Sequence, residues 1–261
     1  MSFEEGIAAQ MKGIREIKEE FQKADRKEKE TLMMLYQSDT RKGVQELLAK
    51  ERKNKEKLQQ EMHRLENMKI FEKKYHDHMA ICGIDEAGRG PLAGPVVAGA
   101  VILPKDCSIL YLNDSKQVSA SRREALYDEI KEKAVASAVG VISPQRIDEI
   151  NILQATYEAM RQAIEGLGIL PDLLLVDAVT IPDVSMKQVG IIKGDAKSVS
   201  IAAASILAKV TRDRMMVEYD KIYPEYGFAK HKGYGSAFHT EAIRKYGPCP
   251  IHRRSFIKNF I

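Results

Sequence analysis

The chain has 261 residues, 44% of them hydrophobic and 30% charged, a composition that fits one main folded domain plus an extension and argues against wholesale disorder. No apolar stretch is long enough to span a bilayer, so we expect neither export nor a membrane anchor, and the net charge of +4 fits a polyanionic partner without establishing one. The three thiols form no Cys-x-x-Cys pair, which argues against a disulfide framework or zinc knuckle and favours a reducing, cytoplasmic environment.

Residues 1–77 form a distinct helical extension. They contain 18 Lys or Arg, 16 Asp or Glu and no proline, whereas all nine prolines lie at or after Pro91. Apolar residues recur at the three-and-four spacing of amphipathic helices: Ile7, Met11, Ile14 (or Ile17), Phe21, Val44, Leu47, Leu48, Leu58, Met62 and Leu65. Gly43 and the cluster Ser38–Thr40 are predicted to separate two helical arms.

This extension has two interpretations. It either grips nucleic acid or a partner protein, or it is a helical hairpin whose charges face water. The interleaved and nearly balanced charges favour the solvated hairpin.

From Met79 onward the sequence has the pattern of strands and helices that is typical of an α/β domain. Met79–Ile84 and Val96–Leu103 are predicted to be an antiparallel pair of strands. A capping box at Ser121 and Glu124 predicts a helix to Lys133, and alternation predicts a third strand over Ala134–Ile142.

The rest of the domain alternates helices and strands. Ser143-Pro144 and Asn151 are predicted to open two helices, the second ending near Gly166. Leu173–Val176 has the continuous apolar pattern of a strand covered on both faces, and Lys187–Ile192 is predicted as a fifth strand. The remaining elements are a long helix, a short helix and a tail expected to pack back onto the domain: Ser198–Tyr219, Glu241–Tyr246, and Phe256-Ile257 with Phe260-Ile261.

Acidic residues follow three of these apolar runs. Ile84 leads into Asp85-Glu86, Leu173–Val176 leads into Asp177, and the fifth strand is followed closely by Asp195. A carboxylate beside a buried run needs a cation or strong donors. Four such groups gathered at one edge of a sheet would repel one another, and hard divalent cations such as Mg²⁺ or Mn²⁺ suit that role. Zinc is disfavoured because no His or Cys follows these runs in the same way.

Each acid also has a simpler interpretation as a helix cap or surface ion pair. Asp195 in particular could cap the helix that follows it. Asp85 and Glu86 would point to opposite faces of a regular strand, so both serve one site only if the strand ends or bends there. Gly88 and Gly90 make such a bend credible.

Gly88-Arg89-Gly90 offers backbone donors and a guanidinium beside two of the acids, which suits a sugar-phosphate chain, although a tight turn explains the glycines equally well. Nucleotide-binding glycine loops and a Gly-x-Ser-x-Gly elbow are absent from the sequence. His231, His239 and His252 have no metal-like spacing and are expected to pack in loops or contact phosphate.

The segment Gly83–Pro95 resembles the signature of ribonuclease HII. The resemblance continues in order across residues 80–256, through Asn113–Lys116, Val176–Ala178, Lys193–Asp195, Ser200–Asp213, His231–Gly235 and His252–Phe256. It implies an α/β, ribonuclease H-like fold with a mixed five-stranded sheet flanked by helices, a C-terminal helical part and the N-terminal helical extension. The expected domains are therefore residues 1–77 and 78–261.

By this resemblance, two Mg²⁺ or Mn²⁺ ions are held by Asp85, Glu86, Asp177 and Asp195. The implied activity is hydrolysis of RNA in RNA-DNA hybrids and incision 5′ of a single ribonucleotide embedded in duplex DNA, leaving 3′-hydroxyl and 5′-phosphate ends. These two nucleic acids are the implied partners.

The resemblance also assigns substrate contacts. Gly88-Arg89-Gly90 would read the 2′-hydroxyl, the group that distinguishes RNA from DNA at one nucleotide, and Tyr234 would stack on the next sugar. Ser115, Lys116 and Lys209 are candidate phosphate contacts, with surface solvation or helix packing as their alternative.

Two points bear on the assignment. Ribonuclease HIII usually has lysine between the two glycines, so Arg89 favours HII, whereas the extension departs from the minimal family pattern. The alternatives to an enzyme are a non-catalytic nucleic-acid-binding module or a helical adaptor with a secondary nuclease domain. The presence of all four acids argues against the first.

Overall fold

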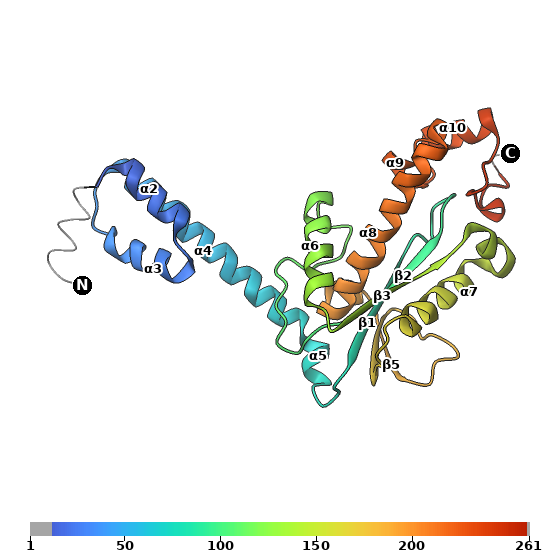
Figure 1. Cartoon of the computed structure of the whole chain (residues 1–261), viewed down its shortest axis with the longest axis horizontal. Helices are drawn as coiled ribbons and strands as arrows, with labels where there is room; N and C mark the ends of the chain where they lie inside the picture. Colours follow the sequence, from blue (N-terminus) through green and yellow to red (C-terminus); the bar gives the residue numbers. More distant parts are fainter. Residues whose placement is uncertain (1–11, 260–261) are drawn as a thin grey trace. The chain divides into compact units, whose positions relative to one another are not determined.

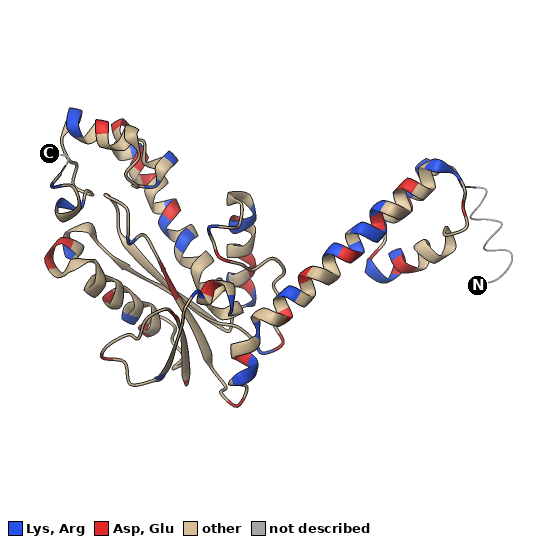
Figure 2. Cartoon of the chain, turned by 180° about the vertical axis from the view of Figure 1, so that it is seen from behind, with Lys and Arg blue, Asp and Glu red and all other residues tan. Residues whose placement is uncertain are grey.

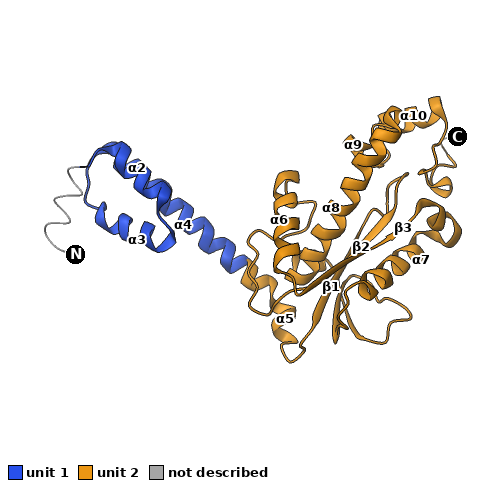
Figure 3. Cartoon of the chain, viewed as in Figure 1, with its two compact units in different colours: residues 1–64 blue, residues 65–261 orange. Residues whose placement is uncertain are grey.

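The chain divides into two compact units after Arg64 (Figure 3). The computed structural model describes residues 12–259, so the predicted apolar positions Ile7 and Met11 and the tail residues Phe260-Ile261 lie outside the described residues. The division between residues 77 and 78 stays a prediction, and each unit is described by itself.

The first unit is built from the helices α2 (Ile14–Lys23) and α3 (Arg26–Leu35) and the first part of α4 (Lys42–Met68). Its small core consists of five buried side chains: Ile17, Phe21, Tyr36, Val44 and Leu48. All but Tyr36, which lies at the end of α3, are among the predicted apolar positions. The predicted separation near Ser38–Thr40 is correct, and basic and acidic residues interleave along the ribbon of α4 (Figure 2).

Two details of this unit differ from the prediction. Gly43 lies inside α4 rather than between helices, because the helix already begins at Lys42. The first arm is interrupted at Asp25, whose side chain accepts a hydrogen bond from Glu28 N at 2.8 Å and so starts a second helix.

Residues 65–77 belong to the second unit. Leu65 and Met68 are only 3% and 4% exposed and pack in a core cluster with Val101. In the short helix α5 (Ile70–Lys74), Glu72 accepts hydrogen bonds from Ser198 Oγ at 2.6 Å and Ser200 N at 3.0 Å. This carboxylate therefore satisfies donors at the start of α8 (Val199–Ile222).

A mixed sheet of five strands forms the centre of the second unit, which confirms the predicted fold class. In the order β3-β2-β1-β4-β5 these are Ala136–Ile142, Val96–Ile102, Ile81–Ala87, Leu173–Asp177 and Lys187–Ile191. The β1-β2 and β2-β3 pairs are antiparallel, and β1-β4 and β4-β5 are parallel. The parallel strands end at the same edge of the sheet.

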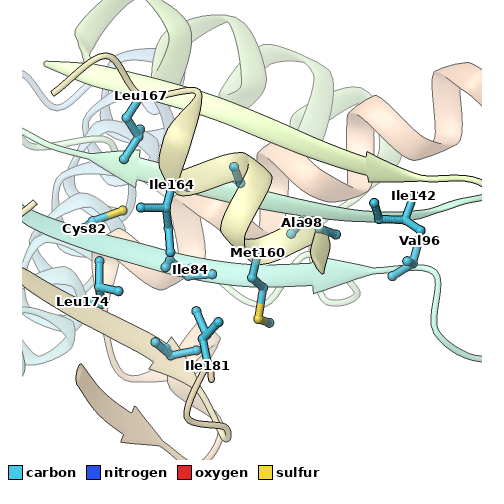
Figure 4. Close-up of a cluster of buried hydrophobic side chains, with 14 of the residues drawn as sticks. Cys82, Ile84, Val96, Ala98, Ile142, Met160, Ile164, Leu167, Leu174 and Ile181 are labelled. Atoms are coloured by element: carbon cyan, nitrogen blue, oxygen red, sulfur yellow. The ribbon is translucent and has the colours of Figure 1, made fainter. Parts of the chain in front are cut away.

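Helices cover both faces of this sheet (Figure 1). Helix α7 (Pro144–Glu165) packs on β2 and β3 over one apolar cluster, which Figure 4 shows around Ile84, Ala98 and Met160. Helix α8 and helix α6 (Ala120–Lys133) lie on the opposite face.

Glycines allow α8 to lie unusually close to the sheet. A Cβ on Gly83 would stand 2.0 Å from the backbone of Ser200, and a Cβ on Gly99 would stand 2.4 Å from the carbonyl oxygen of Ala204. Since the facing residues of α8 are also small, helix and strand backbones are nearly in contact. The side chains of α8 are thereby placed directly against β1.

The predicted helices of this unit are present with small shifts. Ser119, not Ser121, caps α6, because its side chain accepts from Arg122 N. Asn151 does begin a second helical stretch: its φ of 68° breaks α7, and its side chain accepts from Leu153 N and Gln154 N. Helix α9 (Phe228–His231), helix α10 (Ala237–Tyr246) and a buried Ile257 complete the C-terminal part. Within residues 12–259, no helix is sufficiently long and apolar to cross a membrane.

We expect Leu65→Ala to lower the free energy of unfolding by about 2–4 kcal/mol, because it leaves a cavity in the core of the second unit. Met62→Ala, one turn earlier on the same helix at a side chain that is 43% exposed, should cost less than about 1 kcal/mol. Urea unfolding followed by circular dichroism measures both. Equal costs would mean that residues after Arg64 do not anchor α4 in this core.

Candidate active site

Two of the predicted acids lie side by side on neighbouring strands. The parallel register of β1 and β4 pairs Ile84 with Val176, so the next residues, Asp85 and Asp177, follow at the same edge. Neighbouring strands are about 4.8 Å apart. The sheet therefore brings these two carboxylates together, although the two residues lie more than ninety positions apart in the sequence.

Glu86 lies near Asp177 at the side of β1 that β4 no longer covers. Strand β1 pairs with β2 up to Ala87 and ends there, one residue after Glu86 and directly before Gly88, whose φ is +94°. The pairing with β4, however, ends at Ile84. Beyond that point no strand covers this side of β1 within the described residues. Glu86 is consequently within electrostatic range of Asp177 despite the alternation of side chains.

Asp195 reaches the same edge from the turn after β5. It lies in the short 3-10 helix Gly194–Ala196, and Gly194 N donates a hydrogen bond to Asp177 Oδ1 at 2.7 Å. Asp195 does not cap α8, since the N-cap is Ser198, whose side chain accepts from Ile201 N. The helix-cap interpretation of Asp195 is therefore wrong.

The four acids form an electrostatically strained group. Burial raises the pKa of Asp85 well above its usual value, and the charges of Glu86 and Asp177 raise it further. Burial also raises the pKa of Glu86, opposed by Arg89, and that of Asp195, where Asp114 and Asp177 add to the effect. Each raised pKa means that a negative charge is disfavoured here unless positive charge is nearby.

Hard divalent cations fit this donor set. It consists of carboxylate oxygens at one edge of a sheet, with no thiol or imidazole among them. Among residues 12–259, no three acidic, His or Cys side chains already converge on a single point as a complete metal cage. A cage is not required, because Mg²⁺ and Mn²⁺ in phosphate chemistry use few carboxylates and complete their shells with water and substrate oxygens.

A cavity of about 510 Å³ lies beside Asp85 and Glu86. All six predicted substrate-binding residues line it: Gly88, Arg89, Gly90, Ser115, Lys116 and Tyr234. They come from three segments that are distant in sequence, and Tyr234 is 44% exposed. The positively charged Lys116 also lowers the pKa of Glu86 and Asp195, which places it near both acids.

Three further side chains belong to this neighbourhood. Asp114 lies near Asp195 and raises the pKa of its carboxyl, and Ser205 on α8 donates to Ser115 Oγ at 3.0 Å. Lys209, one turn after Ser205, lines the cavity and pairs with Asp213 at 2.7 Å. Asp114 and Ser205 were not singled out from the sequence, because neither follows an apolar strand.

The loop that carries Tyr234 is held by a chain of histidines. Cys249 N donates to His252 Nδ1, so neutral His252 donates through Nε2 to His239 Nε2 at 3.0 Å. His239 then donates through Nδ1 to the carbonyl oxygen of Tyr234 at 2.8 Å. Burial lowers the pKa of both histidines to about 4, which keeps this chain neutral at pH 7. These histidines pack the loop.

Both parts of the chain match models of known protein families. Residues 82–259 match the family model "Ribonuclease HII", and residues 13–76 match the model "Ribonuclease HII N-terminal domain". Ribonuclease HII of Lachnoclostridium phytofermentans is 65% identical over 86% of this chain and 88% of its own, and that of Clostridioides difficile is 52% identical over 97% and 100%. The crystal structure of ribonuclease H2 from Pyrococcus horikoshii OT3 superposes with a TM-score of 0.56, at 32% identity over 68% of this chain and 93% of that one.

We expect Asp85→Asn to raise the melting temperature of the metal-free protein at pH 7. The folded-state pKa of Asp85 lies above its unfolded value, so its charge destabilises the fold at pH values above that pKa, and the penalty fades as the pH falls through it. The gain should be roughly 2–4 °C for each kcal/mol of repulsion relieved.

Differential scanning fluorimetry in EDTA measures this change across pH 4–8. Asp148→Asn is the matched control: that carboxylate accepts hydrogen bonds from Arg254 N and Ser255 N away from the acids, so its loss should lower the melting temperature. A lower melting temperature for Asp85→Asn would show that repulsion does not dominate at this edge.

Proposed function

The chain belongs to the ribonuclease HII family of RNase H-type endoribonucleases, and on this basis we propose that it incises duplex DNA 5′ of a single embedded ribonucleotide as well as RNA in RNA-DNA hybrids. The products are a 3′-hydroxyl and a 5′-phosphate. The observation that carries the proposal is the convergence of Asp85, Glu86, Asp177 and Asp195 at the sheet edge beside the cavity of Gly88–Gly90 and Tyr234.

The four acids would hold Mg²⁺ or Mn²⁺, two ions by family resemblance. When bound, the ions supply positive charge to the scissile phosphate and lower the pKa of the attacking water. The raised pKa values of Asp85, Glu86 and Asp195 support this role, because such groups gain most from a neighbouring cation.

The chain's own residues bind and orient the nucleic acid. Lys116 and Arg89 are cations at the cavity and suit neighbouring phosphates. The exposed ring of Tyr234 offers an apolar surface to a sugar, and Gly88–Gly90 offers backbone donors to a 2′-hydroxyl. Ser115 is 5% exposed and is held by Ser205, so it presents a fixed hydroxyl rather than a mobile one.

The decisive experiment is cleavage of a DNA duplex carrying one ribonucleotide, with Mn²⁺. We expect a single cut on the 5′ side of the ribonucleotide and no cut in the matched all-DNA duplex. Asp85→Asn should reduce kcat by roughly a hundredfold or more, because a lost carboxylate removes charge stabilisation from the transition state. Binding without cleavage by the parent protein would instead support the non-catalytic module, and equal rates would remove Asp85 from the mechanism.

The two glycines of the loop give a second prediction. Gly88 has a φ of +94°, and its Cβ would lie 2.1 Å from Arg212 Nε, so Gly88→Ala should destabilise the fold. A Cβ on Gly90 meets nothing closer than Tyr234 Cε1 at 3.9 Å, so Gly90→Ala should leave the melting temperature unchanged. It should nevertheless lower kcat/KM at least tenfold, because the methyl group occupies the space that the sugar needs.

Melting curves and single-turnover cleavage of the one-ribonucleotide duplex separate the two effects. Parental kcat/KM in Gly90→Ala would contradict the placement of the sugar between Gly90 and Tyr234.

A further inference from the structure

Two arginines are completely buried beneath the cavity loop. Arg212 on α8 and Arg253 near the C-terminus are both 0% exposed. Neither forms an ion pair with a carboxylate in residues 12–259. Instead they donate seven hydrogen bonds, all to main-chain carbonyl oxygens.

The acceptors of Arg253 all belong to the loop of residues 88–95. Its Nη2 donates to Gly88 O at 2.5 Å and to Pro95 O at 3.1 Å, its Nη1 to Arg89 O at 2.8 Å, and its Nε to Gly94 O at 2.9 Å. One planar guanidinium therefore holds both ends of the loop.

Such burial is costly and needs a reason. Burial lowers the pKa of Arg253 to about 9 and that of Arg212 to about 10, so both remain charged at pH 7. A buried charge without a counter-ion costs several kcal/mol unless strong hydrogen bonds offset it. Bonds to neutral carbonyls offset it only partly, since a carboxylate would be the stronger acceptor. What the arrangement provides is a fixed orientation of the loop backbone.

The geometry of the peptide group determines where the N–H groups of this loop point. In a trans peptide the C=O and the following N–H point in opposite directions. Because Gly88 O and Arg89 O face Arg253, the N–H groups of Arg89 and Gly90 point away from it. Both residues are exposed, and across the described part of the chain neither N–H has a hydrogen-bond partner. Two unpaired donors are thus presented at the cavity.

Arg212 fixes the second wall of the same space. Its Nη1 donates to Lys232 O at 2.9 Å, its Nη2 to Ala93 O at 3.0 Å and its Nε to Pro95 O at 2.9 Å. It therefore ties the cavity loop to the turn that carries Tyr234. Leu92 N adds a direct bond to Gly233 O at 2.8 Å.

We propose that Arg253 and Arg212 are positioning residues for sugar selectivity: Arg253 aims the N–H groups of Arg89 and Gly90 at the 2′-hydroxyl, and Arg212 sets the distance between this pair and Tyr234. The inference rests on the proposed function, because it assumes that the cavity loop reads a ribose. It adds a physical reason why the loop would recognise the 2′-hydroxyl: Arg253 and Arg212 orient it without contacting the substrate.

The test compares each residue with lysine, which keeps the charge and loses the planar fork. Full-length parent, Arg253→Lys and Arg212→Lys cleave a DNA duplex with one ribonucleotide and the same duplex with a 2′-fluoro nucleotide at that position. Single-turnover rates are measured at least 15 °C below each melting temperature. Arg146→Lys is the matched control, because Arg146 is an exposed arginine of α7 paired with Glu149 and Glu158.

In Arg253→Lys we expect kcat/KM for the ribonucleotide duplex to fall tenfold or more while that for the 2′-fluoro duplex changes less than threefold, so the selectivity ratio collapses. Arg146→Lys should keep the parental ratio. Arg212→Lys should slow both substrates, with a smaller change in ratio, since it moves Tyr234 as well. Equal losses on both substrates in Arg253→Lys, or an unchanged ratio, would overturn the inference.

A parent protein that cuts both duplexes equally well would instead disprove the proposed reading of the 2′-hydroxyl. If Arg253→Lys does not fold, amide exchange of the parent followed by NMR decides. We expect the amides of Arg89 and Gly90 to exchange rapidly when free and to be protected by the ribonucleotide duplex in Ca²⁺. The amides of Leu92 and Gly94, bonded to Gly233 O and Ile251 O, should be protected in both states. Protection of Arg89 and Gly90 already in the free protein would contradict the inference.

Discussion

Repulsion among carboxylates at one edge of the sheet is the constraint on which the site depends. Parallel pairing of β1 with β4 forces Asp85 and Asp177 to be neighbours, and the turn after β5 adds Asp195 through the bond from Gly194. The strand segments that lead into Asp85 and Asp177 are buried, from Cys82 to Ile84 and from Leu173 to Val176, and so hold these acids in place. The result is an edge at which negative charge is disfavoured unless positive charge is nearby.

Helix α8 connects this acidic edge to the cavity loop. Ser205, Lys209 and Arg212 are spaced four and three residues apart and therefore lie on one face of the helix. The first lies by Asp85, the second lines the cavity and the third holds the loop of residues 88–95. The glycines that let α8 approach the sheet also set how closely these side chains approach the acids. The close packing of α8 on the sheet therefore also determines the geometry of the site.

The sequence predicts the parts of this site that depend on short-range patterns. Apolar runs that end in acids identified three strand ends and the side chains at them, and the elements of the sheet were placed within a few residues. Cap identity was less certain, as Ser119 and Gly43 show, because several polar residues compete near each helix start. The continuation of β1 through Glu86 could not be predicted, because it depends on β2 extending further than β4.

Arg212 and Arg253 show what no local pattern can reveal. Their carbonyl partners in the loop of residues 88–95 lie 117–119 positions from Arg212 and 158–165 positions from Arg253. Nothing in a run such as Lys209–Asp213 marks one arginine as buried. The acids, in contrast, are brought together by the sheet and by the turn that follows β5. The acidic edge and the cavity loop are therefore built by different parts of the chain. The first is built by β1, β4, β5 and the turn after β5, whereas the second is completed only when the residues after Tyr226 pack back over Gly88–Pro95. Since Arg253 donates only to the loop of residues 88–95, we expect substitutions of this arginine to affect the proposed reading of the sugar more than the arrangement of the acids.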